Sequence, residues 1–253
     1  MPETRHLQHH INSGYIRVVT DMHQQIPAFW AHPTVGREFP GLVLLHDDWG
    51  LGAAMRNIAH RFAEVGYYVI VPDLFDGNKA YNQIEADGLE IRYKTEALPK
   101  ANSTLKALET HPKCNSKMAV LGWDLGAELA INLALERMDV MATVAFYGNP
   151  ARFFGELNEL HCPLLAIYAE QDEIPFEKVQ QLEQELLTND NRHQVTVYPN
   201  TSHGFYNHLT PAYAPAAAED AWRELLDFLE RYQGKPPAPT EAEPGRFNHG
   251  RIY

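Results

Sequence analysis

The stretch Met118-Ala-Val-Leu-Gly-Trp-Asp-Leu-Gly-Ala-Glu-Leu-Ala130 decides the fold of this chain. A continuous apolar run leads into a tight turn flanked by Gly122 and Gly126, and helix-forming residues follow directly. This order predicts a buried strand, a sharp turn and the start of a helix, with Asp124 at the tip of the turn. Such a turn brings two backbones close together, which glycine permits because it has no Cβ.

Residues 122–126 follow the pattern Gly-x-nucleophile-x-Gly, the nucleophile elbow of α/β-hydrolases, with aspartate where serine or cysteine is usual. Serine and cysteine thiolate form acyl-enzymes from esters, whereas a carboxylate forms useful covalent intermediates mainly by attacking saturated carbon. Attack of Asp124 on an ester would give a reactive anhydride. The sequence therefore disfavours ordinary esterase chemistry.

Strand-like and helix-like segments alternate along the chain, which is the pattern of a parallel sheet covered on both faces. The expected strands are 15–20 and 25–31, which form a hairpin, then 41–46, 67–72, 118–121, 140–147, 163–168 and 193–198. The expected helices are 53–65, a long helix from about 87 to 111, then 127–137, 176–187 and 215–232. The connection between 147 and 162 is too short for a cap. We therefore predict an α/β-hydrolase fold, a mostly parallel central sheet of about eight strands with helices on both faces and no large cap domain.

Composition narrows the class of protein. The chain has 253 residues, 45% hydrophobic and 21% charged, which suits one globular domain with a full core. Acidic residues outnumber basic ones by 33 to 21, and the formal net charge of −12 disfavours binding to nucleic acid or to an anionic membrane. Two cysteines, Cys114 and Cys162, form no disulfide framework, so a reducing compartment is expected.

The two ends of the chain carry further expectations. Residues 1–6 lack the apolar core of a signal peptide, and no apolar run reaches membrane-spanning length, so a cytoplasmic location is expected. Residues 233–245 are rich in proline and poor in apolar residues. We therefore expect a hydrolase domain over 1–232 and a proline-rich, solvated C-terminal tail over 233–253.

Two downstream segments supply an acid and a histidine in the chain order of α/β-hydrolases. Asp172 follows an apolar strand in a turn, where its carboxylate could accept a hydrogen bond from a histidine Nδ1 and orient the ring. Glu170 and Glu173 are its near rivals. His203 follows the last expected strand, and His208 is the second choice among the 13 histidines.

Two backbone N–H groups are candidates for an oxyanion hole. One belongs to Leu125, directly after Asp124 and at the start of a helix whose dipole favours negative charge. The other belongs to the loop 46–52. The run Asp48-Trp-Gly50 resembles the nucleophile turn of haloalkane dehalogenases, but it precedes the expected helix 53–65 and the strand 67–72. Its position therefore indicates an oxyanion loop.

Taken together, these segments resemble the dienelactone hydrolase family of α/β-hydrolases over about residues 15–232. The most specific parts are 44–51, 66–75, the elbow, Asp172, and 203–205 followed by 217–229. The resemblance implies a lightly covered hydrolase with a triad of Asp124, Asp172 and His203. It also implies that Asp47 takes the place of the glutamate that contacts the resting nucleophile, and that Asp48 donates the second oxyanion N–H.

Two positions depart from the family pattern. The nucleophile is usually cysteine, sometimes serine, and here it is Asp124. Enzymes of the family that act on dienelactone carry an arginine four residues after the triad histidine, and this chain has Asn207 there. Because bidentate carboxylate recognition is an arginine property, the namesake substrate is not expected. Trp49 and Trp123 are candidate donors in the substrate pocket, with ordinary core packing as the alternative for both. Together with Asp47 and Asn207 they are the residues that we expect to bind the substrate.

The sequence leaves three functions open. In the first, Asp124 attacks a carbon bearing a halide or an epoxide oxygen, and His203 activates the water that hydrolyses the ester. In the second, Asp47 and Asp124 share a proton and catalyse a lyase, isomerase or cyclase step. In the third, the protein binds a ligand without turnover. We predict a cofactor-free hydrolase with an Asp-His-Asp triad that acts on a small organic substrate, with no metal; the oligomeric state is left open.

Overall fold

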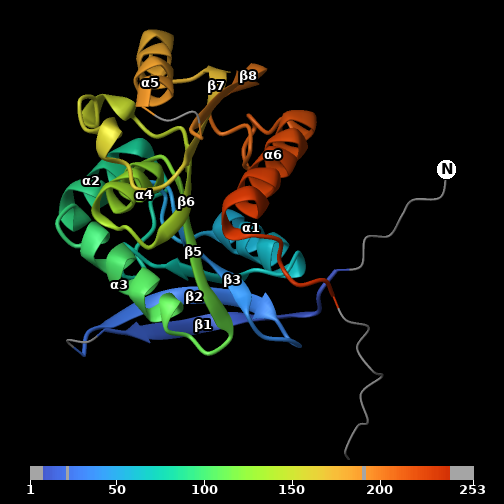
Figure 1. The fold of residues 1–253 in the computed structure, drawn as a ribbon. Coiled ribbons are helices and arrows are strands. Elements are labelled where there is room, and N and C mark those ends of the chain that lie inside the picture. Colours follow the sequence, from blue (N-terminus) through green and yellow to red (C-terminus); the bar gives the residue numbers. More distant parts are fainter. Residues whose placement is uncertain (1–7, 21–22, 190–191, 240–253) are drawn as a thin grey trace, which may run out of the picture.

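The computed structural model describes residues 8–20, 23–189 and 192–239. Its eight strands form one sheet in the order β1-β2-β4-β3-β5-β6-β7-β8. They are β1 (Ile11–Val19), β2 (Gln25–Pro33), β3 (Phe39–Leu45), β4 (Tyr68–Pro72), β5 (Cys114–Trp123), β6 (Val140–Phe146), β7 (Leu164–Gln171) and β8 (Gln194–Ser202). The pairs β1–β2 and β2–β4 are antiparallel, and every other neighbouring pair is parallel. The sheet of the predicted α/β-hydrolase fold is confirmed (Figure 1).

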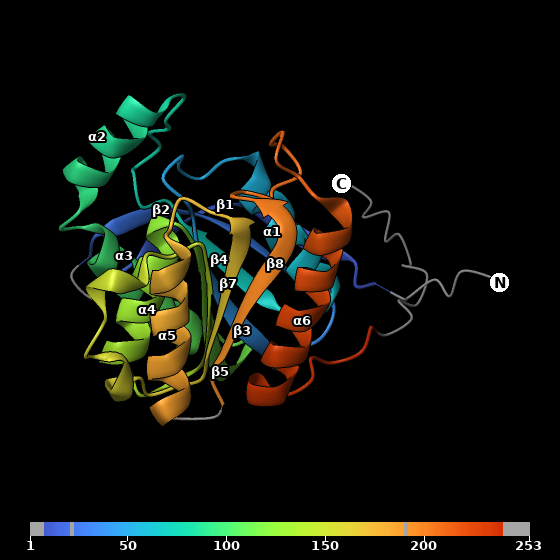
Figure 2. The ribbon, with the colours of Figure 1, turned by 90° about the horizontal axis from the view of Figure 1, so that it is seen from above.

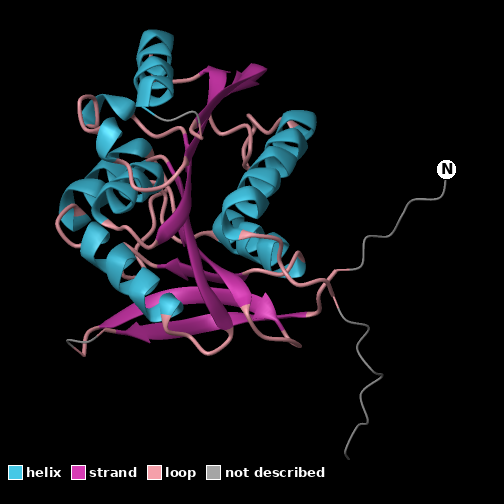
Figure 3. Ribbon diagram, viewed as in Figure 1, coloured by secondary structure: helices cyan, strands magenta, loops and turns pink. Residues whose placement is uncertain are grey.

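Helices cover both faces of the sheet. They are α1 (Ala53–Glu64), α2 (Gln83–Tyr93), α3 (Ala97–Glu109), α4 (Leu125–Glu136), α5 (Phe176–Asn189) and α6 (Pro215–Gln233), with short 3₁₀ helices η1 (Pro150–Arg152) and η2 (Leu157–Glu159). Figure 2 shows α1 and α6 on one side of the sheet and α3, α4 and α5 on the other. Figure 3 shows the twisted sheet between these two helical layers. Only η1 and η2 lie between β6 and β7, so the prediction of no large cap domain is confirmed.

The core follows from the apolar periodicity of the covering helices. Helix α1 buries one stripe that includes Met55, Ile58 and Phe62, and Trp222 of α6 packs on Phe62 with ring centroids 4.7 Å apart. Strand β3 is buried along its whole length, as expected for a parallel strand covered on both faces. Because β3 to β8 run parallel to one another, their carboxyl ends lie at the same edge of the sheet.

The expected long helix from about 87 to 111 is wrong. The structure has two helices there, because α2 ends at Tyr93 and a turn over 94–96 precedes α3. Helix α2 also begins earlier than expected, at the N-cap Asn82, whose side chain accepts the Glu85 N–H. Pro99 explains the break: proline has no N–H and clashes in a helix interior, but it is tolerated in the first turn of α3.

The expected tail begins close to the body of the protein. Helix α6 ends at Gln233, whose side-chain amide donates to the carbonyls of Gly41 and Lys117, both at 2.9 Å. Farther on, the Pro237 carbonyl lies 2.9 Å from Nε2 of His9. Residues 240–253, most of the expected tail, lie outside the described residues, as do residues 1–7. The boundary at 232 stays a prediction.

Two smaller findings bear on the class of protein. Cys114 and Cys162 are free thiols. Among the helices of the described residues, none combines the length and apolar character needed to span a bilayer.

Candidate active site

Asp124 occupies a strained turn between β5 and α4. Its φ of 51° and ψ of −116° are costly for a residue with a Cβ, so the surrounding structure must hold it. Its N–H donates to the Phe146 carbonyl at 3.0 Å. A Cβ on Gly122 would lie 1.9 Å from the Gly126 carbonyl oxygen, and one on Gly126 would lie 2.2 Å from that of Leu45. Both glycines are therefore required by the close approach of neighbouring backbones.

His203 bridges two carboxylates. Its Nε2 lies 3.2 Å from Oδ1 of Asp124, and its Nδ1 lies 3.1 Å from Oδ1 of Asp172. The Asp172 side chain is almost fully buried, with 3% exposed, and it also accepts the backbone N–H groups of Ala169 and Ile174. These bonds fix the carboxylate that orients the imidazole ring.

The rival residues have other contacts. Glu170 accepts the N–H of Asn200 at 2.7 Å, and the exposed Glu173 lines a cavity described below. Nε2 of His208 lies 3.1 Å from the side-chain amide of Asn57. The three residues expected at the triad positions are therefore the ones that the structure brings together.

The charges in this chain of contacts are coupled. Burial lowers the pKa of His203, but hydrogen bonds and charge from Asp124 and Asp172 outweigh burial and raise it to about 10. Burial raises the pKa of Asp124, and the contact with His203 opposes that rise. While Asp124 is charged, these contacts favour the protonated form of His203. A protonated His203 cannot take a proton from water until the charge on Asp124 is removed.

Two more carboxylates lie in the loop after β3. Asp47 accepts the N–H of Trp49 at 3.1 Å, and burial followed by the charge of Asp124 raises the pKa of Asp47 to about 7. Burial, then the charge of Asp124, raises the pKa of Asp48 to about 7, while a hydrogen bond from the Leu125 N–H lowers it. The Leu125 N–H thus faces the Asp48 side chain, a contact that the sequence did not predict.

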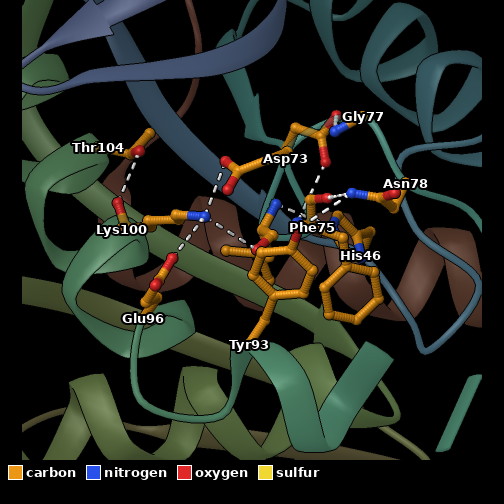
Figure 4. Close-up of polar contacts among 11 residues, drawn as sticks. His46, Asp73, Phe75, Gly77, Asn78, Tyr93, Glu96, Lys100 and Thr104 are labelled. Atoms are coloured by element: carbon orange, nitrogen blue, oxygen red, sulfur yellow. Dashed lines mark hydrogen bonds and ion pairs between the residues drawn. The ribbon is translucent and has the colours of Figure 1, made fainter. Parts of the chain in front are cut away.

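His46 holds this loop in place. A carbonyl oxygen can only accept, so Nδ1 of His46 donates to the Asp47 carbonyl at 2.7 Å. Nε2 accepts the N–H of Leu74 at 3.0 Å, which fixes the neutral tautomer. Burial lowers the pKa of His46 to about 4, so the ring is uncharged at neutral pH. The imidazole therefore joins the loop after β3 to the loop after β4 (Figure 4).

The loop after β4 is anchored in turn by charged side chains. The Asp73 carboxylate accepts the N–H of Gly77 at 2.9 Å. Nζ of Lys100, on α3, donates to the Leu74 carbonyl at 3.2 Å and to Asp76 at 2.8 Å (Figure 4). These contacts fix the approach to residues 79–81, which line a cavity beside Asp124.

Two cavities flank Asp124. The first, of about 330 Å³, is called the acidic cavity here because Asp48, Glu90, Asp124, Glu128, Asp172 and Glu173 line it. The second, of about 430 Å³, is called the apolar cavity because its walls include Trp49, Ala53, Ala54, Met55, Trp123 and Leu209. All four residues predicted to bind substrate, Asp47, Trp49, Trp123 and Asn207, line the apolar cavity. Their contact with substrate stays a prediction.

Tyr147 is a site residue that sequence reasoning missed. It follows β6 with a φ of 60°, and its ring centroid lies 4.6 Å from that of His203. Its hydroxyl oxygen accepts the N–H of Tyr206 at 3.3 Å, and burial raises its pKa far above the usual value, so the phenol stays protonated. The available signal was its place at the carboxyl end of a parallel strand, where ligand sites gather.

Two further observations complete the site. Nε1 of Trp123 has no hydrogen-bond partner among the described residues, and the indole stacks on Phe146 with centroids 5.1 Å apart. Within residues 8–20, 23–189 and 192–239, no three His, Cys, Asp or Glu side chains are placed to hold a metal ion.

The chain is similar in sequence to known proteins. The model of the dienelactone hydrolase family matches residues 26–233. Protein usf from Aquifex pyrophilus is 28% identical over 204 residues, which cover 76% of this chain and 88% of that protein. A protein from Salmonella typhi, provisionally named a carboxymethylenebutenolidase, is 24% identical over 240 residues, covering 88% of this chain and 89% of its own length.

Solved structures show the same fold. A provisionally named dienelactone hydrolase from Klebsiella pneumoniae superposes with a TM-score of 0.77 at 21% identity, over 88% of this chain and 100% of that one. The dienelactone hydrolase-like promiscuous phosphotriesterase P91 from metagenomic libraries gives a TM-score of 0.76 at 18% identity, over 88% and 98% of the two chains.

Proposed function

Because the chain belongs to the dienelactone hydrolase family and is a hydrolase, we propose that it hydrolyses a small organic substrate at a saturated carbon. In this proposal Asp124 is the nucleophile, His203 is the base and Asp172 orients the base. The observation that carries it is a carboxylate at the nucleophile elbow, 3.2 Å from the Nε2 of a histidine whose pKa is raised to about 10.

In the first step, an oxygen of Asp124 attacks the carbon that bears the leaving group. A carbon–oxygen bond forms, the bond to the leaving group breaks, and the leaving group departs with the electron pair. The product is an ester of Asp124. An epoxide oxygen would leave as an alkoxide and take up the proton that His203 releases.

Formation of the ester switches the state of His203. The negative charge of Asp124 disappears, so the pKa of His203 falls toward its ordinary value and the ring can lose its proton. Neutral His203 then takes a proton from water, whose oxygen attacks the ester carbonyl. The Leu125 N–H lies at the start of α4 and faces the Asp48 carboxylate, so it would stabilise the negative oxygen only after Asp48 gives up this hydrogen bond. The bond between the acyl carbon and the alkyl oxygen then breaks, and the alkoxide takes the proton from His203 and leaves as an alcohol. The carboxylic acid formed at Asp124 passes its proton to His203, which restores the starting state.

The same residues disfavour the substrate implied by the name of the Salmonella relative. A carboxymethylenebutenolide is a lactone with a carboxylate, and carboxylate attack on a lactone carbonyl would form an anhydride. Its carboxylate would also meet Asp47 and Asp124, without an arginine at position 207 to bind it. Attack at saturated carbon avoids both obstacles.

A single turnover in H₂¹⁸O tests the proposal, using alkyl halides, epoxides and lactones with enzyme in excess. Nucleophilic attack places one ¹⁸O in the peptide that contains Asp124 and none in the alcohol. In His203→Ala we expect the alkyl ester to accumulate as a mass increase on the intact protein, and Asp124→Asn should give no adduct. The substitution His208→Ala is the matched control and should leave turnover unchanged.

The opposite labelling pattern would contradict the mechanism. If ¹⁸O appears only in the product and no variant accumulates an adduct, water attacks the substrate directly and Asp124 is not the nucleophile.

A further inference from the structure

The acidic and apolar cavities have three residues in common, Asp124, Tyr147 and His203. The proposed function requires that the reacting carbon of the substrate binds next to the Asp124 carboxylate. From there, the substrate can extend one group into each cavity. The walls of the two cavities therefore set the chemistry of the two ends of the substrate.

The acidic cavity has more negative charge than its own cations neutralise. Asp172 is paired with His203, and Glu128 is paired with Arg152. The other carboxylates besides Asp124, namely Asp48, Glu90 and Glu173, have no cation within ion-pair distance among the described residues. The repulsion is visible at Asp48, whose pKa is raised by burial, then by Asp124 and Glu90.

The positive charges in this cavity are few. His203 and Lys178 are the basic residues among its lining side chains. The charge of His203 is already shared between Asp124 and Asp172, at 3.2 and 3.1 Å. An anionic group in this cavity would meet uncompensated carboxylates, whereas a cationic group would relieve their repulsion.

The shape of the charge distribution favours a large cation over a metal ion. No three of the described acidic, histidine or cysteine side chains converge on a point that could hold a metal. Instead, the carboxylates come from different elements: Asp48 from the loop after β3, Glu90 from α2, Glu128 from α4 and Glu173 from the turn after β7. Carboxylates spread along a wall suit an organic ammonium group.

We propose that the substrate carries an ammonium group, which lies in the acidic cavity, and an apolar group, which lies between Trp49 and Leu209 in the apolar cavity. This inference names the substrate class of the site and rests on the proposed function. It also accounts for Asn207, since a cationic substrate needs no arginine to bind a carboxylate.

Equilibrium binding of three small probes to the full-length protein tests the charge preference without turnover. Benzylammonium, benzyl alcohol and phenylacetate share an aromatic ring and differ in charge, and titration calorimetry at pH 7.5 gives their dissociation constants. We expect benzylammonium to bind most tightly and phenylacetate least. Glu90→Gln and Glu173→Gln should each weaken benzylammonium binding about 2- to 5-fold, the range of partly screened ion pairs, and leave benzyl alcohol unchanged.

Glu177→Gln is the matched control, because Glu177 is an exposed carboxylate on α5 that does not line the cavity. It should change none of the three constants, which separates a local effect from the net charge of −12. Equal binding of the three probes overturns the inference. The inference is also overturned if phenylacetate binds most tightly of the three probes and Lys178→Met abolishes that binding.

The outcome is separable from that of the proposed function. Incorporation of ¹⁸O into Asp124 from a neutral alkyl halide, without preference for benzylammonium, rejects only the ammonium substrate. Tight, Glu90-dependent binding of benzylammonium, with ammonium-bearing halides and epoxides that never label Asp124, supports the charge preference and rejects only the proposed reaction.

Discussion

The protonation of His203 depends on two neighbouring carboxylates, of which Asp124 would lose its charge in the proposed reaction. Its ring nitrogens lie 3.2 Å from Asp124 and 3.1 Å from Asp172, and these two carboxylates raise its pKa to about 10 against the effect of burial. In the proposed function, an aspartate at the elbow therefore changes two properties at once: the chemical nature of the nucleophile and the protonation of His203 before the reaction.

Replacement of Asp124 by asparagine should expose this coupling. Asparagine keeps the size of the side chain but carries no charge, so we expect the pKa of His203 to fall by about 1 to 3 units. An NMR titration of the imidazole nitrogens measures the change. Glu170→Gln, which alters a carboxylate bonded to Asn200, is the control and should leave the value unchanged. An unchanged pKa in Asp124→Asn would show that Asp124 does not set the charge of His203.

At the scale of elements, the backbones of β5, α4 and the end of β3 approach one another closely at the turn that carries Asp124. Gly126 faces the Leu45 carbonyl, and Gly122 faces the backbone of Gly126. This contact fixes Asp124 at the carboxyl edge of the sheet. It leaves no room for a side chain on either glycine.

Gly126→Ala should therefore cost about 3 kcal/mol or more of unfolding free energy, since a Cβ would lie 2.2 Å from a backbone oxygen that cannot move alone. Urea denaturation measures the loss. Gly88→Ala is the control, because Gly88 lies within α2 and a Cβ there meets nothing within 4 Å. That variant should gain roughly 0.5 to 1 kcal/mol. Equal stability of Gly126→Ala and the unmodified protein would contradict the close approach.

His46, which joins the loops after β3 and β4, predicts that the stability of the fold depends on pH. Burial in the folded state lowers the pKa of His46 from 6.5 to about 4. The folded protein therefore binds a proton at His46 more weakly than the unfolded chain does. The stabilisation is complete above about 6.5 and is lost as pH falls toward 4. In His46→Gln, the loss of stability between pH 6.5 and 4 should be shallower. Thermal unfolding across this pH range measures the slope. His161→Gln, at an exposed histidine, should keep the original slope; if His46→Gln keeps it too, the prediction fails.

At the scale of the whole molecule, the active site lowers the stability of the fold above neutral pH. Burial, followed by the charge of Asp124, raises the pKa of Asp47 to about 7. Its stabilising contribution is complete below about 3.8 and is lost as pH rises through 7. The protein therefore retains a buried carboxylate that opposes folding at pH 8, which is characteristic of functional sites.

Asp47→Asn should stabilise the protein by about 1 to 3 kcal/mol at pH 8, because asparagine cannot ionise. At pH 4 the difference should be small, because both side chains are then neutral in the fold. Differential scanning calorimetry at the two pH values measures the effect. Glu183→Gln removes an exposed charge from α5 and should change stability by less than about 0.5 kcal/mol at either pH. No gain at pH 8 in Asp47→Asn would contradict the raised pKa.

Short stretches of sequence predicted the sheet, and they also predicted that Asp124, Asp172 and His203 lie close together. The apolar runs of β3 and β5 mark buried parallel strands, and the turn at Asp124 needs its two glycines. Pro99 is a local signal for the break between α2 and α3, and the prediction of one long helix did not use it.

Other features of the site depend on tertiary packing and have no local signature. Tyr147 reaches His203 only because β6 ends beside the loop after β8. The contact between the Leu125 N–H and the Asp48 carboxylate joins residues 77 positions apart in the chain. The charge of the acidic cavity likewise comes from four separate elements, so no window of sequence reveals it.

The separate origin of the two cavity walls bears on how the specificity of this protein can evolve. Outside the three shared residues, the acidic cavity is built from α2, α4 and the segment 172–178, with Asp48 and Asn149. The apolar cavity is lined by residues 47, 49–50, 52–55, 79–81, 123, 204, 207 and 209–210. Mutations that adapt one end of a substrate therefore have little reason to disturb the other. Selection, or a protein engineer, can change the wall of one cavity at a time without changing Asp124, Tyr147 or His203.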